Sequence, residues 1–253
     1  MDNDGQPEKG NGLLMYGWRA KIGLITPMSE NAEHAYHIYA PEGVTFSSMK
    51  ITFPGPTPEG LMILTDQLEE TAAKYRGYNL DLVVFGCTSG SCIRGAGWDQ
   101  ECIRRIERAS GWPGLTTSTA VLESLRALGC KKVAVLTPYP DDTNQAEKEF
   151  LEDNGFEVTT IVGMDMSQFD GNGLEFEDAD EYFLYQHAVR MDLKGADVFF
   201  LSCMGLTTME IIDPLETAMG VPVVTSHQAT LWSALRHCRV GAKLTGLGRL
   251  FAL

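Results

Sequence analysis

The sequence predicts an α/β protein with two pseudo-symmetric, doubly wound parallel-sheet lobes of the flavodoxin-like kind and an active site between them. Two observations favour this fold class: an internal repeat, and an alternation of short apolar segments with stretches of helical length. A chain of 253 residues with 44% hydrophobic content is long enough to form two lobes, each with its own core.

The repeat consists of three apolar segments, each typical of a buried strand, which occur twice in the same order. They read KIGLITP, DLVVFGC and GWPGLT at 21–27, 81–87 and 111–116, and KVAVLTP, DVFFLSC and GVPVVT at 132–138, 197–203 and 220–225. The spacing between the copies is about 110 residues each time, which predicts a duplicated half-protein.

Amphipathic stretches of helical length separate these segments, at 58–76, 98–110, 118–129, 142–154, 178–194, 208–219 and 227–238. Strands that alternate with crossover helices predict parallel sheets covered on both faces. We expect residues 1–18 to form a mobile tail, 19–113 with 225–253 the first lobe, and 114–224 the second.

Cys87 and Cys203 are the candidate catalytic residues, because each follows the equivalent strand of its repeat. Ligands of doubly wound sheets bind beyond the carboxyl ends of the strands, so a pseudo-twofold pairing would place the two thiols across one cleft. Two thiols can take a proton from one face of a carbon and return it to the other. A helix N-terminus after each strand would favour the thiolate. The alternative for either cysteine alone is a buried core residue.

Candidate substrate-binding groups surround the two cysteines. Thr88 and Ser89 offer hydroxyls, and Met204 and Gly205 offer backbone N–H groups, to a carboxylate or to the enediolate formed from it. Helix capping is the alternative role of the two hydroxyls.

Three further residues are candidates from their places in the repeat. Tyr139 follows the second Thr-Pro, and Asn31 lies in the corresponding loop of the first half, so both are expected near the substrate. Packing is the alternative for Tyr139. His227 follows the last predicted strand and is a weaker candidate at the edge of the cleft.

Composition narrows the partners. A net charge of -14 and a sequence pI near 4.7 argue against a nucleic acid or an anionic membrane surface. Six cysteines without a CxxC pair are typical of reduced thiols, so we expect a cytoplasmic protein. Nucleotide-binding and α/β-hydrolase motifs are missing, and the two-thiol chemistry requires neither a metal nor an organic cofactor. The oligomeric state stays open, and a homo-oligomer is compatible with the sequence.

Several longer motifs resemble a known family. They read TPEG at 57–60, TSTAVL at 117–122, LRALG at 125–129 and GRLF at 248–251, together with Tyr139. With the two cysteines, they are similar to the aspartate/glutamate racemase superfamily, within it the branch of arylmalonate decarboxylases and maleate cis-trans isomerases. The resemblance covers nearly everything after residue 20.

The resemblance implies roles for the candidate residues. The pocket that binds the carboxylate and stabilises the enediolate would be formed by Thr88, Ser89 and Tyr139 with the backbone near Met204. Cys203 would be the proton donor, and Pro27 would line the same cavity. The chain departs from the decarboxylases at Cys87, where they carry a glycine, and at Met204-Gly205, where they have a Gly-Gly pair.

Three functions follow from these observations. The first is a cofactor-independent isomerase of a small carboxylate, either a racemase or a maleate-type cis-trans isomerase, that requires both cysteines. The second is an arylmalonate-type decarboxylase in which only Cys203 is essential. The third is a two-lobed protein that binds a small acid without chemistry. The second thiol favours the isomerase, whereas the side group of the substrate is not specified by the sequence.

Overall fold

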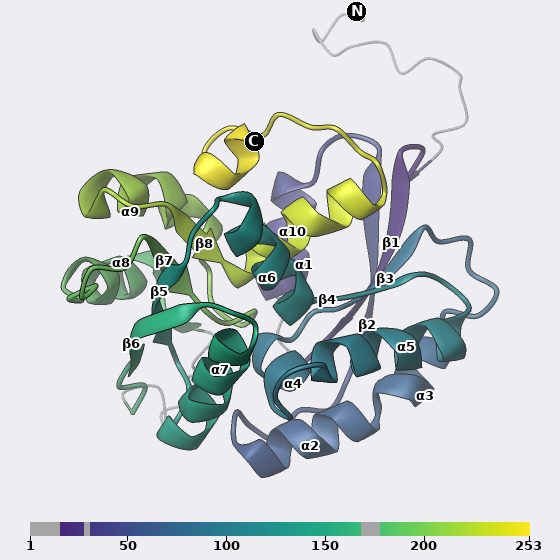
Figure 1. Ribbon diagram of the computed structural model, residues 1–253. Coiled ribbons are helices and arrows are strands. Elements are labelled where there is room, and N and C mark those ends of the chain that lie inside the picture. Colours follow the sequence, from purple (N-terminus) through teal and green to yellow (C-terminus); the bar gives the residue numbers. More distant parts are fainter. Residues whose placement is uncertain (1–15, 28–30, 168–177) are drawn as a thin grey trace, which may run out of the picture.

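The computed structural model describes residues 16–27, 31–167 and 178–253 (Figure 1). Most of the expected tail lies outside these residues, and residues 16–18 lead directly into the first strand. In the described parts of the chain, no helix combines the length and the apolar character that crossing a bilayer requires.

Two four-stranded parallel sheets form the framework, and their strands follow the same order. The first sheet runs β2-β1-β3-β4 and the second β6-β5-β7-β8. Their bounds are β1 (Ala20–Thr26), β2 (Val44–Lys50), β3 (Leu82–Phe85), β4 (Gly114–Thr116), β5 (Lys132–Thr137), β6 (Glu157–Gly163), β7 (Val198–Leu201) and β8 (Val223–Thr225). The predicted fold class is therefore confirmed, and each repeated segment supplies the same strand of its own sheet.

Helices cover both faces of each sheet. They are α1 (Asn31–Tyr39), α2 (Pro58–Asp66), α3 (Leu68–Ala73), α4 (Thr88–Cys92), α5 (Trp98–Ser110), α6 (Thr117–Ala127), α7 (Asp141–Asp153), α8 (Glu181–Val189), α9 (Ile212–Met219) and α10 (Ser226–His237). The helix expected at 98–110 has those bounds. The stretch expected at 58–76 is two helices, which meet at Gln67. Strands β2 and β6 and helix α1 were not anticipated, and helix α4 was expected only as a helix N-terminus after Cys87, without bounds.

Three buried clusters show which helices pack on which face. Residues of α2, α3 and α5 join Ile25, Val83 and Phe85 of the first sheet. Residues of α6 and α7 join Val133 and Val135 of the second sheet. A third cluster runs between the two sheets and includes residues of α1, α8, α9 and α10. Burial on both faces explains why the strands are continuous apolar runs rather than alternating ones.

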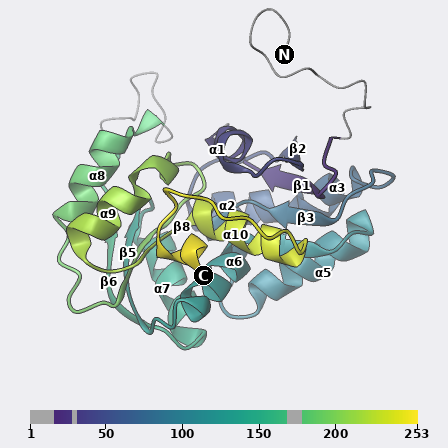
Figure 2. The ribbon, with the colours of Figure 1, turned by 90° about the horizontal axis from the view of Figure 1, so that it is seen from above.

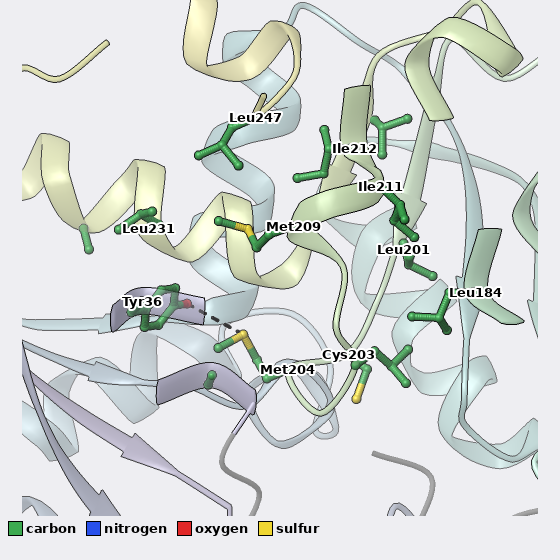
Figure 3. Close-up of a cluster of buried hydrophobic side chains, with 14 of the residues drawn as sticks. Tyr36, Leu184, Leu201, Cys203, Met204, Met209, Ile211, Ile212, Leu231 and Leu247 are labelled. Atoms are coloured by element: carbon green, nitrogen blue, oxygen red, sulfur yellow. Dashed lines mark hydrogen bonds between the residues drawn. The ribbon is translucent and has the colours of Figure 1, made fainter. Parts of the chain in front are cut away.

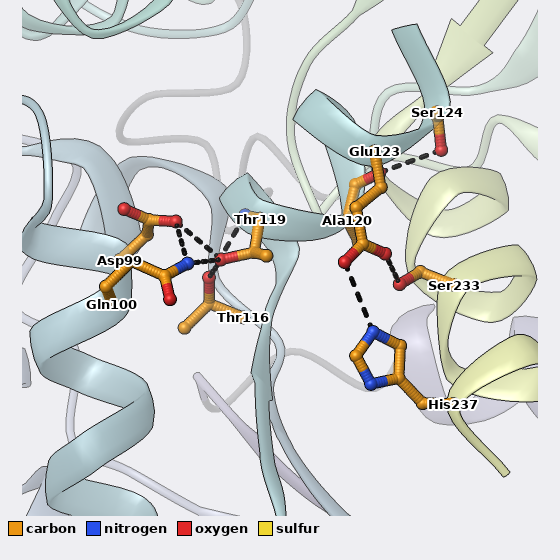
Figure 4. A network of polar contacts seen from close by, with 9 residues as sticks. All are labelled: Asp99, Gln100, Thr116, Thr119, Ala120, Glu123, Ser124, Ser233 and His237. Atoms are coloured by element: carbon orange, nitrogen blue, oxygen red, sulfur yellow. Dashed lines mark hydrogen bonds and ion pairs between the residues drawn. The ribbon is translucent and has the colours of Figure 1, made fainter. Parts of the chain in front are cut away.

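Helices α6 and α10 join the two halves. They are equivalent elements of the repeat, since each follows the last strand of its sheet, and they lie side by side in both views (Figures 1 and 2). Thr230 Oγ1 donates to Thr117 Oγ1 across their buried interface at 3.1 Å. Glu123 accepts from Ser233 Oγ and lies 3.2 Å from His237 Nε2, so α6 and α10 are also tied by a polar network (Figure 4).

The expected division into lobes begins the second lobe at residue 114. The three residues of β4 form hydrogen bonds with β3, however, so this strand belongs to the first sheet. Leu231, Ala234 and Leu235 of α10 pack in the cluster that lies between the two sheets and includes residues of both β1 and β5. The division itself remains a prediction, and the sheets place its first boundary after β4.

Thr225 begins α10 with a reciprocal cap, and it is fully buried. Its side chain accepts from Gln228 N at 3.2 Å, and Gln228 Oε1 accepts from Thr225 N at 3.2 Å. We expect Thr225→Ala to lower the free energy of unfolding by about 1 kcal/mol or more, measured by urea denaturation, because it leaves a buried donor without its partner. Thr225→Ser keeps the oxygen and should lose less; an equal loss in the two variants would contradict the capping role.

Candidate active site

The ends of β3 and β7 meet at one pocket. Cys87 follows β3 and caps α4, and Cys203 follows β7. The pocket is lined by Thr26, Pro27, Phe53, Cys87, Thr88, Ser89, Tyr139, Cys203, Met204 and Gly205. Asn31, a further candidate, donates through Nδ2 to the carbonyl of Gly205 at 2.6 Å. The candidate residues of both halves are thus brought together, while Thr26 and Phe53 were not anticipated.

The Cys87 thiol is buried and has 5% of its surface exposed. Its sulfur accepts from Gly90 N at 3.4 Å, and a Cβ at position 90 would lie 3.0 Å from that sulfur, so a glycine permits this approach. Burial raises the pKa of Cys87 to about 11, although the Gly90 N–H and the Ser89 side chain lower it in part. The donors at the helix N-terminus therefore favour the thiolate, as expected, but desolvation outweighs them and raises the pKa.

Cys203 has an unusual backbone conformation, with φ at 152°, in a region that favours glycine. The surrounding structure holds it there: Cys203 N donates to Ser226 Oγ at 3.1 Å, and Gly205 N donates to the Cys203 sulfur at 3.2 Å. Such conformations cost about 1–3 kcal/mol and persist where neighbouring contacts over-determine them. In Figure 3, Met204 turns toward the Tyr36 hydroxyl, 3.9 Å from its sulfur, while the Cys203 thiol points away from Tyr36.

Ser226 connects the two cysteine loops. Its hydroxyl accepts from the backbone of Cys203 and lies 2.8 Å from Thr88 Oγ1, so one oxygen touches the binding loop of each half. Ser226 was not anticipated. Its position directly after the repeat segment 220–225, as the first residue of the helix after β8, was the signal that could have found it.

Tyr139 lies beside both thiols and is buried. Burial raises the pKa of its phenol well above the ordinary value, and Cys203, Glu147 and Cys87 raise it further, including a hydrogen bond with Cys203. Tyr139 therefore keeps its proton and is a donor. Its loop is fixed because Tyr139 N donates to Thr137 Oγ1 at 3.0 Å and Asn144 Nδ2 donates to the Tyr139 carbonyl at 3.0 Å.

Glu147 is a buried carboxyl group behind the Cys203 loop that was not anticipated. Ser202 Oγ donates to its Oε1 at 2.6 Å, and only 2% of the residue is exposed. Within the described residues, its Oε2 has no hydrogen-bond partner. Burial raises the pKa of Glu147 to about 7, and the Ser202 hydroxyl lowers it in part.

His227 and Cys92 do not line this pocket. His227 is fully buried, its ring packs edge-on against Tyr36, and its Nδ1 lies 3.3 Å from Thr208 Oγ1. Burial lowers the pKa of His227 to about 4, so the ring is neutral at physiological pH. Cys92 is buried on α4, and burial raises its pKa well above the ordinary value.

The residues that line the pocket offer an anion hydroxyls and backbone N–H groups, and none of these lining residues is Arg, Lys or His. Donors fixed in a buried site can stabilise negative charge that develops on a substrate, since they need not reorganise during the reaction. With two thiols beside them, the arrangement can move a proton to or from a carbon next to a carboxylate, or add sulfur to a double bond.

The fold and the pocket define a two-lobed α/β protein with one cysteine from each half in a shared site. Residues 22–251 match the family model of arylmalonate decarboxylase. Arylmalonate decarboxylase of Bordetella bronchiseptica is 32% identical over 234 residues, 91% of this chain and 95% of that protein. The chain therefore belongs to the arylmalonate decarboxylase family, which confirms the branch expected from the motifs.

Maleate isomerases are also related. The enzyme of Pseudomonas putida is 23% identical over 246 residues, 92% of this chain and 97% of that protein. The structure of a Nocardia farcinica maleate cis-trans isomerase, a Cys-to-Ser mutant with a covalently bound succinylcysteine intermediate, has a TM-score of 0.83 at 20% identity. It covers 92% of this chain and 98% of that one, and the likeness shows the shared fold.

The backbone of Cys203 generates a prediction about stability. Cys203→Gly should be more stable than Cys203→Ala by about 1 kcal/mol, measured by denaturant unfolding, because glycine adopts the positive φ without strain. Cys102 lies within helix α5 and provides the matched control, since there alanine should be the more stable of the two replacements. The same order of stability at both positions would show that Cys203 is not strained.

Proposed function

We propose that this protein is a cofactor-independent isomerase of a small carboxylate and that Cys87 and Cys203 act on opposite faces of the substrate. The observation that carries the proposal is that both thiols line one pocket together with Thr88, Ser89 and Tyr139. The substrate carboxylate would accept hydrogen bonds from these hydroxyls and from the backbone of the Met204-Gly205 segment.

In a racemisation, one cysteine acts as a thiolate and removes the proton next to the carboxylate. The electron pair of the broken C–H bond moves into the carboxylate and gives an enediolate, which the pocket donors stabilise. The other cysteine, a thiol, then protonates the opposite face. The two cysteines end with exchanged protonation states, so the reverse reaction uses them in exchanged roles.

In a cis-trans isomerisation, one thiolate adds to a carbon of the double bond and forms a C–S bond. The π electrons again move into the carboxylate, and the former double bond becomes a single bond that can rotate. Loss of the thiolate restores the double bond in the trans form. The succinylcysteine bound in the Nocardia farcinica maleate isomerase supports a covalent route of this kind for the related fold.

A decarboxylase is the second candidate, favoured by the 32% identity with arylmalonate decarboxylase. The C–C bond to one carboxylate of a substituted malonate would break, and carbon dioxide would leave. The electron pair of the broken bond would move into the other carboxylate and form the enediolate. Cys203 would then donate a proton to the carbon. Cys87 has no step in this reaction.

Purified protein in deuterated buffer, without added metal or cofactor, tests the proposal. We expect it to exchange an α-proton of a small carboxylate for deuterium or to interconvert maleate and fumarate. Proton NMR would measure either reaction. Cys87→Ala and Cys203→Ala should each lower the rate by about 10²–10⁴-fold, since each removes one of the two proton-transfer groups.

Cys238→Ala is the matched control, because Cys238 lies at the end of α10 and does not line the pocket. Release of carbon dioxide from an arylmalonate at a rate that Cys87→Ala leaves unchanged would reject the isomerase in favour of the decarboxylase.

A further inference from the structure

Helix α7 contacts two loops of the site through its buried side chains. Asn144 binds the loop after β5, where its Oδ1 accepts from Thr137 Oγ1 at 2.6 Å and its Nδ2 donates to the Tyr139 carbonyl. One turn further along, Glu147 accepts from Ser202, the residue directly before Cys203. Two neighbouring side chains of one helix therefore fix the Tyr139 loop and the Cys203 loop against each other.

Glu147 carries an ionisable carboxyl group, although holding the Cys203 loop in place does not require one. An amide or a hydroxyl could accept the Ser202 hydrogen bond, and a buried carboxylate with an unpartnered oxygen is unfavourable. The described residues leave Oε2 without a partner, so the protonated, uncharged form of Glu147 suits this environment. Burial shifts its pKa to about 7, in agreement with this geometry.

The pocket must accept negative charge during the proposed reaction. During turnover the pocket holds a substrate carboxylate and a thiolate, and its lining residues include no cationic side chain. A carboxylate at Glu147 would add another negative charge behind the Cys203 loop. An ionised Glu147 would raise the pKa of Tyr139, which lines the pocket, so its charge would reach the site.

The groups that face Glu147 come from several elements. They are Cys92 on α4, Tyr139 after β5 and Ser202 after β7. Strand β6 begins at Glu157, at the end of the strand away from the site. Glu157 pairs there with Lys132 at 3.5 Å. None of the facing groups is a cation that would stabilise the ionised carboxylate.

We propose that Glu147 is a positioning residue that holds the Cys203 loop through Ser202 and must be protonated for the site to accept an anionic substrate beside a thiolate. This proposal rests on the proposed two-cysteine reaction. Below about pH 7 the neutral carboxyl group donates or accepts without repelling the substrate. As pH rises through the pKa of Glu147, the new charge opposes both substrate binding and thiolate formation.

Glu147→Gln tests the proposal, because the amide keeps the size and the hydrogen bond to Ser202 but cannot ionise. Between pH 6.5 and 8.5, the ratio of kcat/KM of Glu147→Gln to that of the wild type should rise by roughly tenfold, because thiolate formation increases in both proteins while only the wild type gains an added charge in a poorly solvated site. At pH 6.5, Glu147→Gln should be about threefold less active than the wild type. Glu149→Gln, on the exposed side of the same helix, should keep the wild-type profile.

A second measurement does not depend on turnover. The rate at which iodoacetamide alkylates Cys203, followed by peptide mass spectrometry in a Cys87→Ala background, reports thiolate formation at Cys203. Its increase with pH should begin at lower pH in Glu147→Gln than in the Glu147 protein. If Glu147→Gln does not fold, Ser202→Ala serves instead: it keeps the carboxyl group but removes the hydrogen bond that lowers the pKa of Glu147, so the effect of Glu147 ionisation on alkylation should begin at higher pH than in the Glu147 protein, and an unchanged profile would contradict the proposal.

The outcomes separate the two proposals. Absence of turnover with every small carboxylate, together with a shifted alkylation profile, would reject the proposed function and retain the role of Glu147. Identical pH profiles of alkylation and of kcat/KM in wild type and Glu147→Gln would overturn the role of Glu147, whatever reaction the protein catalyses.

Discussion

The packing of α6 against α10 is the constraint on which the site depends. Each of these helices begins directly after the last strand of its own sheet, and together they fix how the two halves of the repeat face each other. Ser226, the first residue of α10, touches Thr88 and the backbone of Cys203 beside the pocket, and Thr117, the first residue of α6, bonds to Thr230 of α10. A displacement between the helices would therefore separate the thiols and break the link between the two binding loops.

Hydroxyl and backbone N–H dipoles, together with acids that stay protonated, surround the pocket and can stabilise a negative charge in it. The pKa values of Cys87 and Tyr139 are raised because both are buried, so both hold their protons at rest. Burial also raises the pKa of Glu147, behind the Cys203 loop, to about 7. Burial thus favours the protonated form of acids around a site whose lining offers an anion hydroxyls, thiols and backbone N–H groups. The acidic surface of the chain has no bearing on this local balance.

Much of the fold follows from the sequence because the duplication repeats strand signals in the same order. The strands at the centre of each sheet, β1, β3, β5 and β7, are continuous apolar runs, and such runs are typical of buried parallel strands. The edge strands β2 and β6 were not predicted, because they are only partly buried and carry polar residues such as Ser47 and Thr159. The five-residue helix α4 is too short for a periodic pattern to show.

The site divides in the same manner. Residues directly after a repeated strand, such as Cys87 and Cys203, could be predicted, since the ends of parallel strands converge. The position of Ser226 after a repeated strand could have marked it as well, but its contacts and those of Glu147 could not be predicted, because they depend on which loops helices α10 and α7 approach. The protonation of Cys87 was also beyond the sequence: the helix position predicts a thiolate, whereas the depth of burial, visible only in three dimensions, reverses the direction.

A crystal structure of the protein with a small dicarboxylate bound tests the central claim most directly. The account predicts that the two sulfur atoms contact opposite faces of the bound molecule and that one of its carboxylates accepts hydrogen bonds from Thr88, Ser89 and Tyr139. A ligand bound away from this pocket, or touched by one sulfur while the other is shielded from it, would contradict the account.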